Sequence, residues 1–220
     1  MNFDHLLQAF LEENAKLNLS ALRTPEACRI GNIEDSLALL HSAERHKMQD
    51  TRCKLIDIGT GGGFPLLPLA IARPDWHCTG VDSIKKKVDA VNRIVKKLDI
   101  KNVSVIAERS EILGRKREYR EQYDVVTSRA VAPLNILLEY CAPFARVGGC
   151  IVLWKSMHID EELRESAAAQ KILHCQPLPA YRYSLDGDFG QRQLLIFRKT
   201  APVPPQYPRV VGEAKAHMLR

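Results

Sequence analysis

Apolar positions near the start of the chain follow a helical period. Phe3, Leu6, Leu7, Phe10 and Leu11 recur every three to four residues, which predicts an amphipathic helix that buries one face. A second helix is expected from residue 24, where Thr-Pro-Glu offers an N-cap residue and a proline suited to the first turn. The first fifty residues are therefore predicted to form a helical N-terminal extension.

After residue 50 the pattern changes to short apolar runs that alternate with helical stretches. Buried strands are expected at residues 54–58, 77–81, 103–107, 123–128, 148–155 and 194–198. Helices are expected between them, at residues 65–73, 84–98, 133–144 and 159–173. This alternation is typical of a parallel, doubly wound α/β sheet.

The length of 220 residues suits one α/β domain with a full core. We therefore predict a single domain over residues 1–220, made of the helical extension (1–50), a Rossmann-like core (51–200) and a basic, proline-containing tail (201–220). Apolar runs stay far below the ~20 residues of a membrane span, and the N-terminus lacks the pattern of a signal peptide. A cytoplasmic protein with no membrane partner is expected.

Cysteines and charge give weaker indications. The six cysteines are scattered without zinc spacing, so we expect reduced, mostly buried thiols and no metal site. A net charge of +6 suits a polyanionic partner. Basic residues gather at residues 85–101, at 115–120 and in the C-terminal part. Glutamates interleave with the middle cluster, which favours a solvated helix face there.

The most informative motif is Asp-Ile-Gly-Thr-Gly-Gly-Gly-Phe-Pro at residues 57–65, where the first predicted strand must turn into a helix. Gly59, Gly61 and Gly63 allow a tight turn and close approach of the backbone to a ligand. A dinucleotide fingerprint would need glycine at Phe64. The spacing therefore argues against a dehydrogenase and favours a cofactor without a pyrophosphate. A glycine-rich turn without a ligand is the alternative.

The ends of the next two predicted strands carry further candidates. Asp82 ends the second strand and follows Gly61 at the distance at which a carboxylate accepts hydrogen bonds from ribose hydroxyls. Ser83 is expected to cap the helix that follows, although both residues could serve only as caps. Ala107 and Glu108 end the third strand, where backbone groups can bind adenine. The Glu108 side chain could equally be an ordinary exposed residue.

The fourth strand ends at residues 127–133, Thr-Ser-Arg-Ala-Val-Ala-Pro. The Asn/Asp-Pro-Pro-aromatic tetrad of base-amine methyltransferases is missing there. A nucleophilic cysteine is also missing, since Cys141 falls inside the next predicted helix. Arg129 stands at this point and could bind guanine O6 and N7 or a phosphate. A surface salt bridge is the alternative role for Arg129.

Together these residues resemble the glucose-inhibited division protein B family, also called RsmG, over nearly the whole chain. The resemblance is carried by residues 16–22, 34–37, 57–65, 82–83, 86–88, 128–132, 155, 192–199 and 207–209. It implies a methyltransferase that uses S-adenosylmethionine, releases S-adenosylhomocysteine and methylates guanine N(7) in 16S ribosomal RNA. The implied partner is 16S ribosomal RNA or the small ribosomal subunit, and we expect a monomer.

The expected site combines the motifs with this resemblance, which implies contacts at Gly59, Phe64, Ala107–Glu108 and Arg129. The expected cofactor-binding residues are Gly59, Thr60, Gly61, Gly63, Phe64, Asp82, Ser83, Ala107, Glu108 and Arg129. Two residues, Arg129 and Lys155, are expected to act in catalysis. The residues expected to contact RNA are Lys155, Arg192, Arg209 and Lys215. The chain departs from the family pattern at Asn32, Ser156 and Val210, so the family's contacts do not carry over there.

Guanine N7 carries a lone pair and no proton, so its methylation needs no general base, and the task of the enzyme is positioning. Two other functions are compatible with the sequence. One is a methyltransferase that acts on a small molecule or a protein. The other is an RNA-binding relative that has lost catalysis, against which the intact glycines and Asp82 argue.

Overall fold

The computed structural model describes residues 3–46, 52–129 and 132–219. Within these residues, seven strands form one sheet in the order β3-β2-β1-β4-β5-β7-β6. The strands are β1 (Lys54–Ile58), β2 (His77–Asp82), β3 (Val103–Ala107), β4 (Tyr123–Arg129), β5 (Ala145–Lys155), β6 (Cys175–Leu185) and β7 (Gly190–Lys199).

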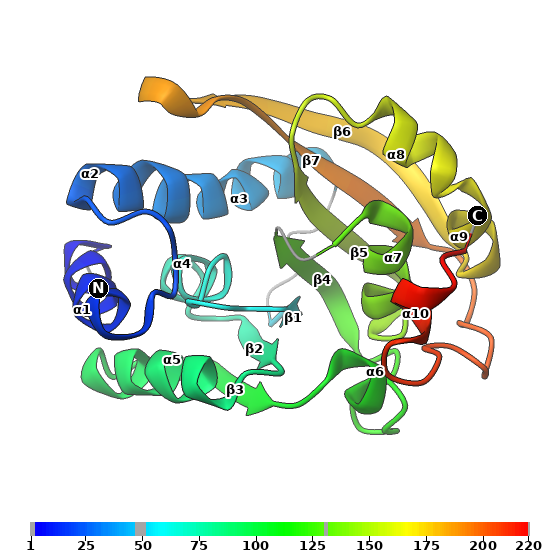
Figure 1. Ribbon diagram of the computed structural model, residues 1–220, viewed down its shortest axis with the longest axis horizontal. Helices are drawn as coiled ribbons and strands as arrows, with labels where there is room; N and C mark the ends of the chain where they lie inside the picture. The colour runs from blue at the N-terminus through cyan, green and yellow to red at the C-terminus, as the bar shows by residue number, and fades with distance from the viewer. Residues whose placement is uncertain (1–2, 47–51, 130–131, 220) are drawn as a thin grey trace.

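Helices cover both faces of the sheet, as Figure 1 shows. One face carries α1 (Phe3–Leu17), α2 (Pro25–Cys28), the π-helix η1 (Arg29–Glu34), α3 (Asp35–His46), α4 (Leu66–Ala72) and α5 (Lys85–Lys97). The other carries α6 (Ser110–Leu113), α7 (Leu134–Cys141), α8 (Asp160–Glu165), α9 (Ala167–Ile172) and α10 (Glu213–Ala216). Successive strand residues point to opposite faces, so Leu55 and Val125 join one core while Ile56 and Val126 join the other.

The expected doubly wound architecture and helical extension are confirmed, but the wholly parallel sheet is wrong. Strands β1 to β5 are parallel, whereas β7 runs antiparallel to β5 and β6 antiparallel to β7. The sequence did not predict β6, which is an edge strand with mostly exposed positions. The helix expected at residues 159–173 is two short helices, α8 and α9.

Two smaller expectations have clear outcomes. Thr24 is the N-cap of α2, and its hydroxyl accepts a hydrogen bond from the Ala27 amide at 3.2 Å. All six cysteines are free and buried, as expected. Across the described residues, no helix is both long and apolar enough to span a bilayer.

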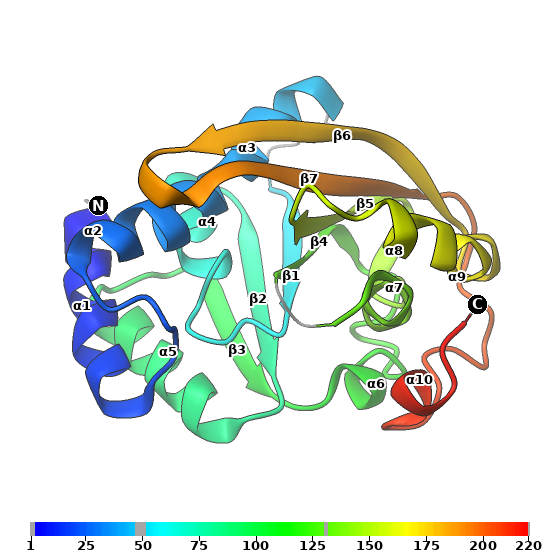
Figure 2. The same ribbon diagram turned by 45° about the horizontal axis from the view of Figure 1, so that its top comes forward.

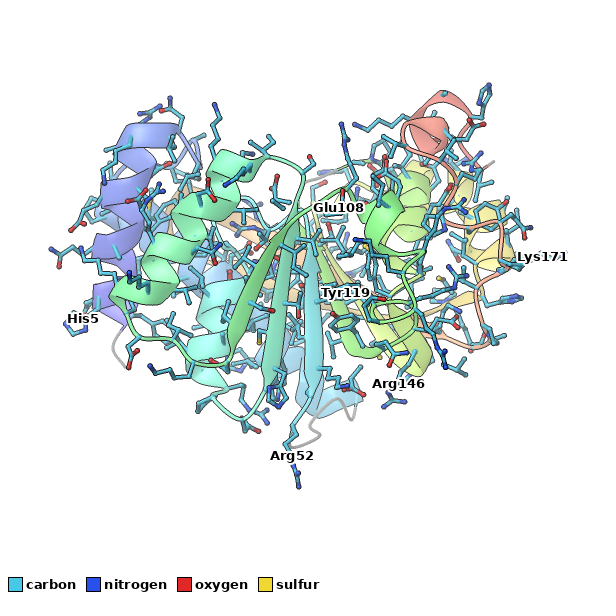
Figure 3. The ribbon with its side chains drawn as sticks, turned by 90° about the horizontal axis from the view of Figure 1, so that it is seen from below. His5, Arg52, Glu108, Tyr119, Arg146 and Lys171 are labelled. Atoms are coloured by element: carbon cyan, nitrogen blue, oxygen red, sulfur yellow. The ribbon has the colours of Figure 1, made fainter. Side chains whose placement is uncertain are left out.

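The topology collects many candidate residues at one edge of the sheet. The carboxyl ends of β1 to β5 meet at the upper edge in Figure 3, where Glu108 follows β3, and Arg52 marks the opposite edge. Because β7 is antiparallel to β5, its first residues return to the carboxyl edge. The β6–β7 hairpin then crosses over α3, as Figure 2 shows, and its tip residue Phe189 packs against Gly31 of η1.

Candidate active site

A cavity of about 390 Å³ opens at the carboxyl edge. Most of the expected cofactor residues line it, together with Leu19, Ser20 and Asn32 from the helical extension. The expected residues found in its wall are Gly59, Thr60, Gly61, Phe64, Asp82, Ser83, Glu108, Arg129 and Lys215. Gly63, Ala107, Lys155, Arg192 and Arg209 are not part of this wall.

Two glycines of the loop have different structural roles. Both have positive φ, +55° for Gly61 and +90° for Gly63, a conformation that favours glycine. A Cβ atom added to Gly61 would meet only the Gly59 carbonyl oxygen, at 3.8 Å, so the space beside it is open to the cavity. A Cβ atom on Gly63 would lie 2.7 Å from Leu67 Cδ1. Gly63 therefore permits packing against α4, whereas Gly61 leaves room for a ligand.

Asp82 joins this loop to the start of α5. Its Oδ2 accepts a hydrogen bond from the Gly61 amide at 3.0 Å, and its Oδ1 accepts one from the Ile84 amide at 2.9 Å. The expectation that Ser83 caps the helix is wrong, because the N-cap residue is Ile84, whose own side chain makes no capping hydrogen bond. Each carboxylate oxygen can accept more than one hydrogen bond, so Asp82 retains capacity to bind a ligand.

Asp57 is a buried carboxyl beneath the loop that sequence reasoning did not assign to the site. It is 1% exposed, and its Oδ1 accepts a hydrogen bond from Thr127 Oγ1 at 2.8 Å. Burial raises the pKa of Asp57 to about 6. The available signal was an acidic residue inside an otherwise apolar strand.

Arg129 is anchored to the helical extension. Its Nη1 donates to the Gly31 carbonyl at 2.9 Å and to Asp35 Oδ2 at 3.0 Å, and its Nη2 donates to Asn32 Oδ1 at 2.9 Å. All three acceptors lie in or directly after the π-helix η1. Such turns are rare in proteins, and those that occur are often found at functional sites. The guanidinium also lies 5.8 Å from the centre of the Phe64 ring.

The opposite end of the cavity follows β3. The Glu108 amide donates to the Asp82 carbonyl at 3.2 Å, while the Glu108 carboxylate accepts from the Arg109 amide at 3.0 Å. Glu111 also lines the cavity and is 4% exposed, and its carboxylate accepts a hydrogen bond from Ser110 Oγ at 3.2 Å. Glu111 was missed because it lies on α6, a short helix without a clear sequence pattern.

Two of the cations expected to act at the site, Lys155 and Arg209, have protein partners instead of open surroundings. Lys155 Nζ lies 2.7 Å from Glu162 Oε2 and donates to the Ala132 carbonyl at 3.1 Å. Arg209 forms a 2.6 Å ion pair with Glu139, which is 1% exposed, and this pairing raises the pKa of Arg209. Arg209 thereby ties the tail to α7. Lys215, by contrast, is exposed at the rim of the cavity.

Much of the basic cluster at residues 85–101 is also neutralised locally. Acidic residues of α1, of α5 itself and of the turn after α5 pair with four of its cations. The ion pairs are Lys85–Asp89 (2.8 Å), Arg93–Glu13 (2.6 Å), Lys97–Glu12 (2.5 Å) and Lys101–Asp99. The pairs with Glu12 and Glu13 dock α5 onto α1, and all four pairs reduce the positive charge that the cluster presents to a partner.

Comparison with known proteins agrees with this architecture. Residues 1–184 match the family model described as rRNA small subunit methyltransferase G. The chain belongs to this family. A ribosomal RNA small subunit methyltransferase G from Carboxydothermus hydrogenoformans is 39% identical over 210 residues, covering 96% of this chain and 87% of that protein. The corresponding protein from Desulforamulus reducens is 36% identical, with 96% and 86% covered.

The fold of this family member is also similar to that of solved methyltransferase structures. A SAM-dependent methyltransferase from Aquifex aeolicus superposes with a TM-score of 0.57 at 13% identity, covering 79% of this chain and 93% of that one. A 16S rRNA (adenine(1408)-N(1))-methyltransferase from Catenulisporales acidiphilia gives 0.54 at 18% identity, with 73% and 92% covered. The resemblance inferred from the motifs is thus confirmed for the family and for the Rossmann-like methyltransferase fold.

Proposed function

We propose that this protein transfers the methyl group of S-adenosylmethionine to N(7) of a guanine in 16S ribosomal RNA and releases S-adenosylhomocysteine. The observation that carries the proposal is the cavity at the carboxyl edge, in which the glycine loop, Asp82 and Arg129 meet in a member of the rRNA small subunit methyltransferase G family. Ribosomal RNA as substrate also makes the cytoplasm the expected place of action.

The residues of the cavity fit the three parts of the cofactor. The open space beside Gly61 provides a cradle for the amino-acid part. The Asp82 carboxylate, held by two backbone amides, suits the ribose hydroxyls as hydrogen-bond donors. Glu108 and the buried Glu111 supply acceptors where the adenine amino group would lie.

The chemistry asked of the protein is positioning and not proton transfer. When bound, S-adenosylmethionine supplies a methyl group on a positively charged sulfur. Guanine N7 presents a lone pair without a proton, so no general base is required. Arg129, fixed by three acceptors beside Phe64, is suited to orient the reacting groups, because a side chain that is already ordered loses little entropy when it binds.

Transfer of a labelled methyl group tests the proposal directly. Purified small-subunit RNA and intact small subunits are incubated with the enzyme and labelled S-adenosylmethionine, and the RNA is digested to nucleosides. We expect the label in 7-methylguanosine. Label in another nucleoside, or only in a protein or small molecule, would reject the guanine-N(7) assignment. Binding of S-adenosylhomocysteine without any transfer would favour an RNA-binding relative that has lost catalysis.

A further inference from the structure

A second cavity of about 310 Å³ lies beside the first at the carboxyl edge. Arg129 belongs to the walls of both cavities. The other residues of the second wall are Asp35, Trp154, Lys155, Ser156, Tyr183 and Arg192.

The β6–β7 hairpin brings distant parts of the chain to this place. Because β7 runs antiparallel to β5, Lys155 at the end of β5 pairs in register with Gln193 near the start of β7. Tyr183 of β6 pairs in turn with Arg192 of β7. The second cavity is therefore a product of the antiparallel end of the sheet, where neither strand β6 nor the direction of β7 was expected.

The charges around the cavity leave one cation available to a ligand. The Asp35 carboxylate already accepts from Arg129 at 3.0 Å and from the Tyr183 hydroxyl at 2.5 Å. Lys155 is paired with Glu162. Among the described residues, no carboxylate forms an ion pair with Arg192, whose guanidinium donates to the carbonyl of its neighbour Gln191 at 3.2 Å.

Two aromatic residues in the wall are held in place. The Tyr183 ring stacks on Tyr181 with centroids 5.8 Å apart and an interplanar angle of 19°. The Trp154 indole N–H donates to the Asp35 carbonyl at 2.9 Å. Fixed aromatic rings beside an available guanidinium match a nucleotide, because bases stack on aromatic side chains and phosphates bind arginine.

We propose that the second cavity binds the target guanine nucleotide, with Tyr183 against the base and Arg192 on a neighbouring phosphate. The inference rests on the proposed function, and it adds where the nucleotide enters and which residues hold it. Arg129, shared by both walls, then borders both the nucleotide and the cofactor. In this proposal the β6–β7 hairpin is the part of the sheet that binds the substrate.

The test compares two cavity variants with a matched control on the same hairpin. Tyr183→Leu removes the ring, and Arg192→Ala removes the available cation. Arg182→Ala removes an exposed cation of β6 that is absent from the cavity wall. RNA affinity is measured over a salt series with S-adenosylhomocysteine present, KM and kcat are measured for methyl transfer, and calorimetry gives the affinity for S-adenosylhomocysteine.

We expect Tyr183→Leu to weaken RNA binding and raise the KM for RNA about tenfold or more, the size of a lost stacking contact. Tyr183→Phe keeps the ring and should recover most of this loss. Arg192→Ala should also raise KM and reduce the salt slope by about 0.7, the effect of one lost phosphate contact on a single strand. Arg182→Ala should keep the RNA affinity and salt slope of the wild type, and all variants should bind S-adenosylhomocysteine within about twofold of it.

Two results would overturn the proposal. The cavity does not bind the nucleotide if Tyr183→Leu and Arg192→Ala leave RNA affinity, KM and salt slope unchanged. It serves the cofactor if the same variants weaken S-adenosylhomocysteine binding as much as RNA binding. A wild-type protein that binds RNA but does not form 7-methylguanosine would instead contradict the proposed function, and the RNA affinities would still decide the role of the cavity.

Discussion

At the carboxyl ends of β2 and β4, two charged side chains are held by different kinds of partner. Asp82, the last residue of β2, accepts hydrogen bonds from the backbone amides of Gly61 and Ile84. Arg129, at the end of β4, donates to the Asp35 carboxylate as well as to Gly31 and Asn32. Farther along the second half of the chain, Lys155 and Arg209 are paired with glutamates.

The difference separates binding from stability. A carboxylate held by amides keeps its negative charge unneutralised and retains free lone pairs, so it can still bind a polar ligand. The charge of a buried cation that is paired with a carboxylate is largely neutralised by that carboxylate. Removing the cation leaves the negative charge of the carboxylate buried without a partner. Asp82 should therefore affect ligand binding, whereas Arg209 should affect folding.

The largest effect is expected from Gly61→Val. The added side chain would occupy the open space beside the loop, so affinity for S-adenosylhomocysteine should fall at least about a hundredfold, equivalent to roughly 3 kcal/mol. Calorimetry on the folded variant measures this loss. Gly187→Val is the matched control, because Gly187 also has positive φ (+64°) and no atom within 4 Å of an added Cβ. Equal loss in both variants would mean that backbone strain, and not occlusion, is responsible.

Arg209→Ala should give the largest change in stability. Removing one partner of a buried ion pair costs about 3–5 kcal/mol, and Glu139 would be left buried without its cation. The free energy of unfolding in urea measures the loss. Lys215→Ala, an exposed cation of the same tail, should leave stability unchanged. An Arg209→Ala protein of normal stability but weakened RNA binding would support the role in RNA contact expected from the sequence.

Asp57→Asn should remove a pH dependence of stability. The pKa of Asp57 is about 6 in the folded protein and about 3.9 in the unfolded chain, so its contribution is greatest below pH ~4 and is lost as pH rises through ~6. Asparagine keeps an acceptor for Thr127 without that loss. The variant should gain on the order of 2–3 kcal/mol relative to the wild type between these pH values. The free energy of unfolding in urea is measured at several pH values for the wild type and the variant. If the two proteins show the same dependence on pH, the raised pKa of Asp57 is contradicted.

The smallest effects should come from Lys97→Ala on α5. Its partner Glu12 is also exposed, and exposed ion pairs contribute about 0–1 kcal/mol. RNA affinity and its salt slope should stay unchanged. Lys96→Ala removes an exposed neighbour on the same helix and provides the comparison. If either variant shows a weaker dependence of RNA affinity on salt concentration, the basic cluster at residues 85–101 contacts RNA.

The sequence predicts what depends on local pattern. The glycine loop, Asp82 and the first five strands follow from spacing and apolar runs, and all lie close to their expected positions. The partners of Arg129 could not be predicted, because the contacts join residues 94 to 98 positions apart. Strand β6 was missed since its positions are mostly exposed and it contains Pro177 and Pro179, which are unfavourable in central strands.

The anchoring of Arg129 also limits how far the protein can be reduced in size. The three acceptors of its guanidinium among the described residues come from residues 31–35, and Gly62 of the loop packs against Phe10 of α1. A minimal enzyme that began at β1 would keep the whole sheet yet lose the groups that fix the arginine and support the loop. The helical extension is thus an integral part of the cavity wall, and an engineer could transplant the core to another protein only together with it.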